Sequence, residues 1–159
     1  MITRLLLLLP LLTFGTVGCA LKRIDLQEPP PSLAYEKNNG KANIVVVRKG
    51  ITAFAVFFGV YINGLHVGDL FPNDVVHHEV EPGVVEMFAG SEKRSWARFP
   101  VEANREYYLR THAKSGVWFA RAQLAVIDDP EKGREWAEKF DDKTFDEPRP
   151  FEFEYPDDE

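Results

Sequence analysis

The sequence predicts an all-β protein: a single antiparallel β-sandwich of about seven or eight short strands, one short C-terminal helix and an acidic tail. Apolar runs rich in Val, Ile, Phe and Tyr recur every ~8 to 12 residues between residues 42 and 127, with turn residues between them. This spacing leaves no room for helical crossovers between parallel strands. With 45% hydrophobic residues in 159, the chain has enough apolar material for one domain.

The predicted strands are separated by recognisable turns. The run 44–47 is β-branched throughout, as expected of a strand that is buried on both faces. Asn63-Gly64 favours a two-residue hairpin turn, so 54–62 is expected to pair with 65–71. Turn residues at 81–83 predict a second hairpin in the same way. The remaining strands are predicted at 75–80, 84–89, 96–101, 107–112 and 117–127.

One short helix is predicted over 128–140. Asp129 can cap its first turn, and Pro130 suits its first position. Trp136 and Phe140 fall on one face at helical spacing, so this face is expected to dock on the sandwich.

The acidic charge of the chain is concentrated at its C-terminal end. Residues 128–159 hold 14 acidic and 5 basic side chains, whereas residues 19–127 have a small basic excess. The tail at 141–159 is acidic and contains three prolines, and it is expected to be flexible. With a net charge of -6, the chain lacks the basic excess that nucleic-acid binding requires.

The first 18 residues have the three-part pattern of a secretory signal peptide. Arg4 precedes an apolar stretch from Leu5 to Phe14, and small residues follow it. This stretch is shorter than the ~20 residues that span a bilayer. We therefore leave residues 1–18 out of the predicted fold.

Cys19 is the only cysteine, and it directly follows this leader. Residues Thr16-Val17-Gly18-Cys19 resemble the bacterial lipobox. The resemblance implies that Cys19 is lipidated and becomes the new N-terminus, and that Ala20 sorts the protein to the outer membrane, facing the periplasm. The alternatives are a signal peptide cut at another bond, which leaves a free thiol, and a retained membrane helix.

Residues 19–41 are predicted to form a linker, because they are polar and include Pro29-Pro30-Pro31. At ~3.1 Å per residue, such a linker could hold the domain up to ~70 Å from a membrane. The predicted organisation is a signal peptide (1–18), a lipidated linker (19–41), a sandwich domain (42–127), a helix (128–140) and a tail (141–159).

The order of the turns carries a family resemblance. The segment "VYINGLHVGDLFPNDVVHHEVEPGVVEMFAG" follows "ANIVVVRKG" and precedes "VEANREYYLR". Over residues 42–127 this order resembles the PEGA-like β-rich domains of small bacterial lipoproteins and envelope proteins. The resemblance implies a β-rich fold and an envelope location, and it implies no particular activity.

Catalytic and metal-binding patterns are weak in this sequence. His77 and His78 are adjacent in a predicted strand, so their side chains point to opposite faces and cannot chelate one metal together. A metal site would need His66 or His112 beside one of them, with a carboxylate such as Glu79 or Asp69. Structural histidines are the alternative. Since no serine stands in a Gly-x-Ser-x-Gly motif, we expect neither enzymatic activity nor a cofactor.

Two sets of residues are predicted to bind partners. One is a basic face, which would bind either the acidic tail or an anionic envelope component, and it consists of Arg94, Arg98, Arg105, Arg110 and Arg121. The other lies in the tail, where Phe151, Phe153 and Tyr155 alternate with glutamates. This segment could add itself to a sheet edge of this chain or of a partner. A tail that only keeps the protein soluble is the alternative.

Together these patterns predict a lipid-anchored, non-catalytic module that contacts another envelope protein or a wall component. The alternative is a small-ligand carrier with a pocket lined by Trp96, Tyr107, Tyr108 and Trp118. A filled core with an exposed aromatic or charged patch favours the interaction module. A closed apolar cavity favours the carrier.

Overall fold

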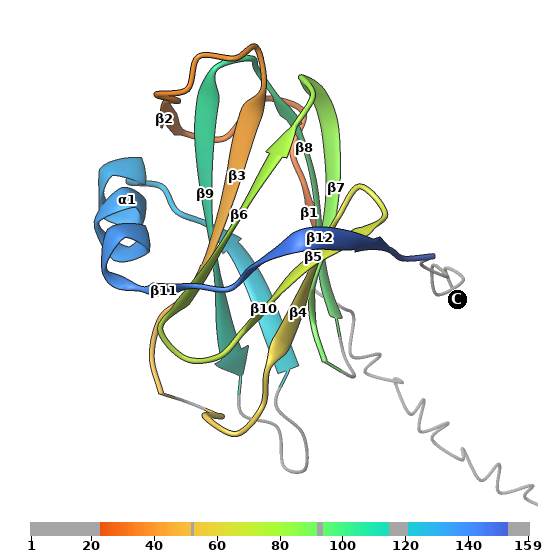
Figure 1. Cartoon of the computed structure of the whole chain (residues 1–159), viewed down its shortest axis with the longest axis vertical. Helices are drawn as coiled ribbons and strands as arrows, with labels where there is room; N and C mark the ends of the chain where they lie inside the picture. Colours follow the sequence, from red (N-terminus) through yellow and green to blue (C-terminus); the bar gives the residue numbers. More distant parts are fainter. Residues whose placement is uncertain (1–22, 52, 92–93, 115–120, 153–159) are drawn as a thin grey trace, which may run out of the picture.

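The computed structural model describes residues 23–51, 53–91, 94–114 and 121–152. These residues form a β-rich fold of twelve strands in two sheets, with one helix packed on the outside (Figure 1). The elements are β1 (Arg23–Asp25), β2 (Ser32–Ala34), β3 (Ala42–Arg48), β4 (Phe58–Ile62), β5 (Leu65–Leu70), β6 (Asp74–Val80), β7 (Gly83–Gly90), β8 (Arg94–Val101), β9 (Arg105–Lys114), β10 (Arg121–Val126), α1 (Pro130–Lys139), β11 (Asp141–Asp142) and β12 (Thr144–Pro150). No helix in the described part of the chain is long and apolar enough to cross a membrane.

The first sheet has the order β1-β8-β7-β4-β5-β12, and the second has the order β10-β9-β3-β6-β11, with β2 also paired to β9. Both sheets are mixed, which differs from the predicted antiparallel sandwich. In the second sheet β3 pairs with β9 in parallel, with Val46 opposite Leu109. No helical crossover is needed, because the chain passes through the first sheet between these two strands. The predicted β-rich fold is confirmed, but the described part of the chain has twelve strands instead of seven or eight, and the antiparallel prediction is wrong for three strand pairs, β1–β8, β3–β9 and β6–β11.

The hairpin predicted at Asn63-Gly64 is confirmed. Both residues have positive φ, at 48° and 77°, and Ile62 pairs with Leu65 across the turn. The predicted hairpin at 81–83 is wrong, because β6 pairs with β3 and β11 whereas β7 pairs with β4 and β8. The chain changes sheets at this turn. A turn signal fixes a reversal of direction, but it does not fix which sheet receives the next strand.

The predicted linker and tail both contribute strands. β1 runs parallel to β8, and β2 pairs with β9, so residues 23–25 and 32–34 belong to the sheets. The predicted reach of ~70 Å is therefore wrong, because the chain joins the sandwich at Arg23. In the tail, β12 pairs with the edge of β5, and β11 pairs with the start of β6. The expected flexibility of the tail is wrong for residues 141–150.

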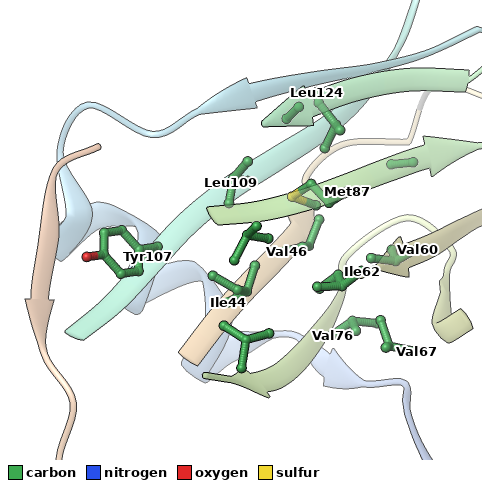
Figure 2. Close-up of a cluster of buried hydrophobic side chains, with 14 of the residues drawn as sticks. Ile44, Val46, Val60, Ile62, Val67, Val76, Met87, Tyr107, Leu109 and Leu124 are labelled. Carbon is green, nitrogen blue, oxygen red and sulfur yellow. The ribbon is translucent and has the colours of Figure 1, made fainter. Parts of the chain in front are cut away.

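The main core lies between the two sheets, where alternate residues of each strand point inward (Figure 2). Ile44, Val46 and Leu109 from the second sheet meet Ile62 and Met87 from the first, and all five are fully buried. Strand β3 is buried along its whole length, as its β-branched run predicts. Its other face forms a second cluster beneath α1.

Helix α1 starts with the predicted capping residue and the predicted first helical residue. The Asp129 side chain accepts a hydrogen bond from the backbone N–H of Lys132 at 3.4 Å, and Pro130 is the first helical residue. Trp136 and Phe140 pack against the second cluster, which includes Tyr108, so the predicted docking face is confirmed. Because α1 covers this part of the outer surface, it creates a cleft at its margin with the second sheet.

Candidate functional site

A cleft of about 380 Å³ lies between α1 and the segment that follows β2. The floor is the outer face of the second sheet, which contributes His77 from β6 and Tyr108 from β9. The rim carries side chains of both charges, and the lining residues are Tyr35, Glu36, Lys37, His77, Glu106, Tyr108, Arg134, Ala137 and Glu138. The cleft therefore has a charged rim, and its floor adjoins the second cluster through Tyr108 and Ala137.

The segment over the cleft is placed by backbone pairing. Leu33 pairs with Glu106 in the β2–β9 ladder, and the Tyr35 N–H donates to the Asn104 carbonyl at 2.9 Å. Asn104 has a positive φ of 56°, and its side-chain oxygen accepts a hydrogen bond from the Gly40 N–H at 2.8 Å. These bonds hold both ends of the 35–40 loop against the second sheet.

Glu79 on β6 ties this loop to the sheet. Its carboxylate accepts hydrogen bonds from the Tyr35 hydroxyl at 2.6 Å, from Lys37 Nζ at 2.7 Å and from Asn39 Nδ2 at 3.1 Å. The bonds from Lys37 and Tyr35 lower the pKa of Glu79 to about 2. Burial and the bond to Glu79 raise the pKa of Tyr35. At neutral pH the carboxylate is thus charged and fully engaged by its three donors.

The inner wall of the cleft is formed by Tyr108 and its partners. The Tyr108 hydroxyl donates to the Glu106 carboxylate and accepts a hydrogen bond from Arg134 Nε at 3.4 Å. Burial and the bond to Glu106 raise the pKa of Tyr108. Arg134 also donates to the Ala34 carbonyl at 3.3 Å, so it links α1 to β2. The described groups hold one another in place, and they do not pair a nucleophile with a base.

A second surface feature is an exposed apolar patch at one end of the sandwich, which we call the apolar loop patch. It consists of Ile51, Phe54, Phe57 and Phe71, whose exposed fractions are 78%, 76%, 48% and 44%. The Phe57 and Phe71 rings lie 6.0 Å apart between centroids. The sequence predicts a strand over 54–62, but β4 begins only at Phe58. The apolar residues before it lie in a loop and face the solvent.

The loop beneath this patch is organised by Arg48, which is 1% exposed. The Arg48 guanidinium donates to the carbonyl oxygens of Ala53 at 2.8 Å, of Leu70 at 2.9 Å and of Val56. It also lies 4.0 Å from the centroid of the Phe58 ring. Burial lowers the pKa of Arg48, and the nearby Asp74 carboxylate opposes this shift. The loop that carries the patch is thus held in place by hydrogen bonds from a buried arginine.

The structure places three residues of the predicted basic face, Arg98, Arg105 and Arg110, at separate positions. Arg98 is exposed on the outer side of the first sheet, where its Nε lies 3.5 Å from Glu86. Arg110 is exposed on the second sheet near α1, and Arg105 bonds to Ser32 through its Nε and Nη2, at 3.0 Å each. Arg94 and Arg121 begin β8 and β10, and their side chains lie outside the described set. The tail strand β12 lies four strands from β8 in the first sheet, so residues 144–150 do not lie beside Arg98.

The aromatic residues predicted to line a ligand pocket also do not converge. Tyr107 and Tyr108 are neighbours on β9, so they enter the two different clusters on opposite faces of the sheet. Trp96 lies on β8, and the Arg23 guanidinium stacks 4.1 Å from its ring centroid. Trp118 lies outside the described residues.

The histidines have structural contacts. His77 and His78 lie opposite Val45 and Ile44 in the β3–β6 ladder, and burial lowers the pKa of His78. His66 Nε2 lies 2.9 Å from Asp69 Oδ1, and the His66 ring stacks on Tyr61 at 4.4 Å. Within the described ranges, no group of three or more His, Cys, Asp or Glu side chains is arranged to hold a metal ion.

The predicted tail site is described only at its first residue. The Phe151 N–H donates to the Gly64 carbonyl at 2.7 Å, and its ring packs on Tyr61 at 4.3 Å. This end of the tail thus continues the β12–β5 pairing on its own sheet. Phe153, Tyr155 and Cys19 lie outside the described residues.

Sequence reasoning missed the cleft, because its parts come from distant segments: Tyr35 and Glu79 are 44 residues apart. It also misread the apolar loop patch, whose phenylalanines at positions 54 and 57 do not alternate as strand residues do. Comparison with protein-family models, curated proteins and solved structures finds no match. The PEGA-like resemblance therefore stays a prediction.

Proposed function

We propose that this chain is a non-catalytic interaction module of the bacterial envelope, anchored to the outer membrane through lipid on Cys19 and facing the periplasm. Its partner is another envelope protein or a wall component, and the cleft between α1 and the 35–40 loop is the surface that binds it. One observation carries this proposal: an open cleft whose rim displays both charges is built on a sandwich whose inward-facing side chains form a buried apolar core.

The chemistry of the cleft suits a polar segment of a partner. Lys37 and Arg134 present positive charge, and Glu36 and Glu138 present negative charge at the same rim. A cleft of about 380 Å³ with charges of both signs at its rim suits a short peptide or peptide-like segment that also carries both charges. We propose a non-catalytic module because Glu79 and Glu106 already accept hydrogen bonds from Tyr35 and Tyr108. Neither carboxylate is therefore placed to act as a general base.

Crosslinking in intact cells tests the cleft as a binding surface. A photoreactive amino acid at position 138, on the rim, should capture a partner, whereas the same group at position 131, on the first turn of α1, should not. Both native residues are exposed glutamates of the same helix. The Arg134→Glu variant should abolish the capture at 138. Equal capture from both positions, or capture that survives Arg134→Glu, would contradict the proposal.

The anchor is tested separately by mass spectrometry of the protein purified from its native host. We expect the N-terminal peptide to begin at Cys19 and to carry the added mass of acyl chains. An unmodified thiol, or cleavage at another bond, would remove the basis for the outer-membrane location.

A further inference from the structure

The apolar loop patch is a concentrated display of large apolar side chains. Single exposed apolar residues are ordinary on protein surfaces, but here three phenylalanines and an isoleucine gather on two adjoining turns. Two of these side chains are more than three-quarters exposed. Such a surface is costly in water, and it indicates contact with something apolar.

The support under the patch shows that it is a built feature of the fold. Arg48 is buried and donates to carbonyl groups on both sides of the patch, at Ala53 and Leu70. Asp74 accepts a hydrogen bond from the Phe71 N–H at 2.8 Å, which fixes the second turn. Buried polar groups of this kind specify one loop conformation. The exposed rings are therefore held outward.

The strand directions place the patch at the end where the chain enters the sandwich. β4 begins directly after the patch, and Gly59 pairs with Gly90 at the end of β7. Gly90 in turn pairs with Arg94 at the start of β8, and β1 runs parallel to β8 with Arg23 opposite Trp96. β1 therefore starts near the same end. This end is at the bottom of Figure 1, where β3 stops and β4 starts.

The distance from Cys19 to this end is short. Four residues along the chain, at ~3.3 to 3.6 Å each, give about 14 Å at most between Cys19 and Arg23. β1 and β4 are three strands apart in the first sheet, or about 14 Å. A lipid on Cys19 therefore draws the end that carries the patch to the surface in which that lipid is embedded.

We propose that the apolar loop patch inserts into the lipid surface to which Cys19 is anchored, so that the sandwich stands on the membrane by its loop end. This inference rests on the lipid anchor of the proposed function. It favours lipid over a second copy of the chain, because the short tether already holds the patch at the membrane. The same end also includes the backbone positions of Arg94, Lys114 and Arg121, which suit anionic headgroups.

The depth of the patch can be measured with a fluorescent amino acid that carries a dansyl side chain. It replaces Phe54 in one full-length protein and Val84 in another, which serves as the matched control. Val84 is an exposed apolar residue near the start of β7, at the opposite end of the sandwich. Both proteins are reconstituted in vesicles of phosphatidylethanolamine and phosphatidylglycerol that contain a nitroxide-labelled lipid.

We expect the probe at position 54 to shift to shorter wavelength and to be quenched severalfold by the nitroxide lipid, while the probe at 84 emits as in water. Equal, water-like emission from both positions would overturn the inference. A shift to shorter wavelength at position 54 that the nitroxide lipid does not quench, and that disappears when the protein is diluted into excess lipid, would identify a second copy as the occupant, and it would overturn the inference as well.

Mass spectrometry of the same preparation separates this inference from the proposed anchor. Acylated Cys19 with a water-exposed probe at 54 overturns the insertion and leaves the anchor standing. Unmodified Cys19 overturns the anchor, and the quenching at position 54 still decides whether the patch enters lipid. Circular dichroism of the two proteins that carry the probe at position 54 or 84 checks that both are folded.

Discussion

Arg48 shows how one buried side chain can shape a surface. Its guanidinium is out of contact with water, yet its hydrogen-bond partners are the backbone carbonyls of the loop that carries the apolar loop patch. Lysine could not replace it, because a single ammonium group lacks the planar fork that reaches carbonyls on two turns. A residue in the core thus determines how four exposed residues are presented.

We predict that Arg48→Met lowers the free energy of unfolding by about 2 to 4 kcal/mol, because it leaves buried carbonyl oxygens without donors. Arg98→Met is the control, since Arg98 is exposed and its one ion pair spans 3.5 Å. The control should change stability by about 0 to 1 kcal/mol. Urea denaturation of both variants measures the difference, and equal losses would contradict the role of Arg48.

Glu79 makes the stability of the cleft depend on pH. Its pKa of about 2 in the folded protein lies below the ordinary value of 4.5. The ionised carboxylate therefore contributes stability that is complete above about pH 4.5 and is lost as the pH falls toward 2. Because the donors Tyr35 and Lys37 belong to the loop, the same acidification should release the loop from the sheet.

We predict that Glu79→Gln costs about 1 kcal/mol at pH 7, and that its difference from the native protein narrows as the pH approaches 2. Urea midpoints at pH 7, 4 and 2.5 measure this trend. Glu81→Gln is the control, because Glu81 is exposed and lies 3.6 Å from Lys41. A cost of Glu79→Gln that stays constant with pH would show that the carboxylate charge is not what holds the loop.

At the scale of elements, the packing of α1 depends on a glycine. A Cβ at Gly133 would lie 2.6 Å from Cβ and Cγ of Tyr108, so only glycine allows the helix to approach the sheet this closely. In an exposed helix, alanine is more favourable than glycine by about 1 kcal/mol. Here we expect the clash with Tyr108 to outweigh that preference. The sequence alone indicates only that Gly133 weakens the helix.

We predict that Gly133→Ala destabilises the protein by about 1 to 3 kcal/mol and loosens the cleft wall, because the helix must move away from Tyr108. Glu138→Ala, at an exposed position of the same helix, should change stability by less than about 0.5 kcal/mol. Thermal unfolding measures both. An increase in melting temperature for Gly133→Ala would mean that helix propensity dominates over the contact.

Elements with local signals could be predicted from the sequence, and those fixed by distant contacts could not. The Asn63-Gly64 turn and the Asp129 cap depend on residues within a few positions, and both are confirmed. The β3–β9 pairing joins segments some 60 residues apart, and nothing in the sequence of either strand indicates which strand it pairs with. The cleft has the same origin, since β2, β6, β9 and α1 meet only in the folded chain.

Strand β12 illustrates a misleading composition. Its sequence, TFDEPRP, is charged and contains Pro148 and Pro150, which is typical of a flexible tail. An edge strand tolerates proline, because one side of its backbone has no partner to bond. Phe145 packs edge-on against His66 of β5, with 5.0 Å between the ring centroids. The composition of the segment does not reveal this contact, which helps to hold β12 on the sheet.

For the whole molecule, the segments outside residues 42–127 close the edges of the sheets. β1 and β12 are the two edges of the first sheet, and the short β11 is one edge of the second. An uncovered edge is a template for pairing with another chain, and short or proline-containing strands are poor templates. Parts of the predicted linker and tail therefore complete the two sheets, and we expect them to limit self-association.

This role predicts the effect of two truncations. A chain that ends at residue 143 keeps β11 but lacks β12, so it exposes the backbone of β5 and uncovers the rings of Tyr61 and His66. We expect it to be less stable and to self-associate with rising concentration, as pairing between β5 edges restores the lost hydrogen bonds. A chain that ends at residue 152 keeps the whole of β12 and the Phe151 contact, and it should sediment like the full-length protein.

Sedimentation velocity in detergent over a hundredfold range of concentration measures both truncations. Identical sedimentation of the two chains would mean that β12 is not needed to protect the edge of β5 from pairing with another chain.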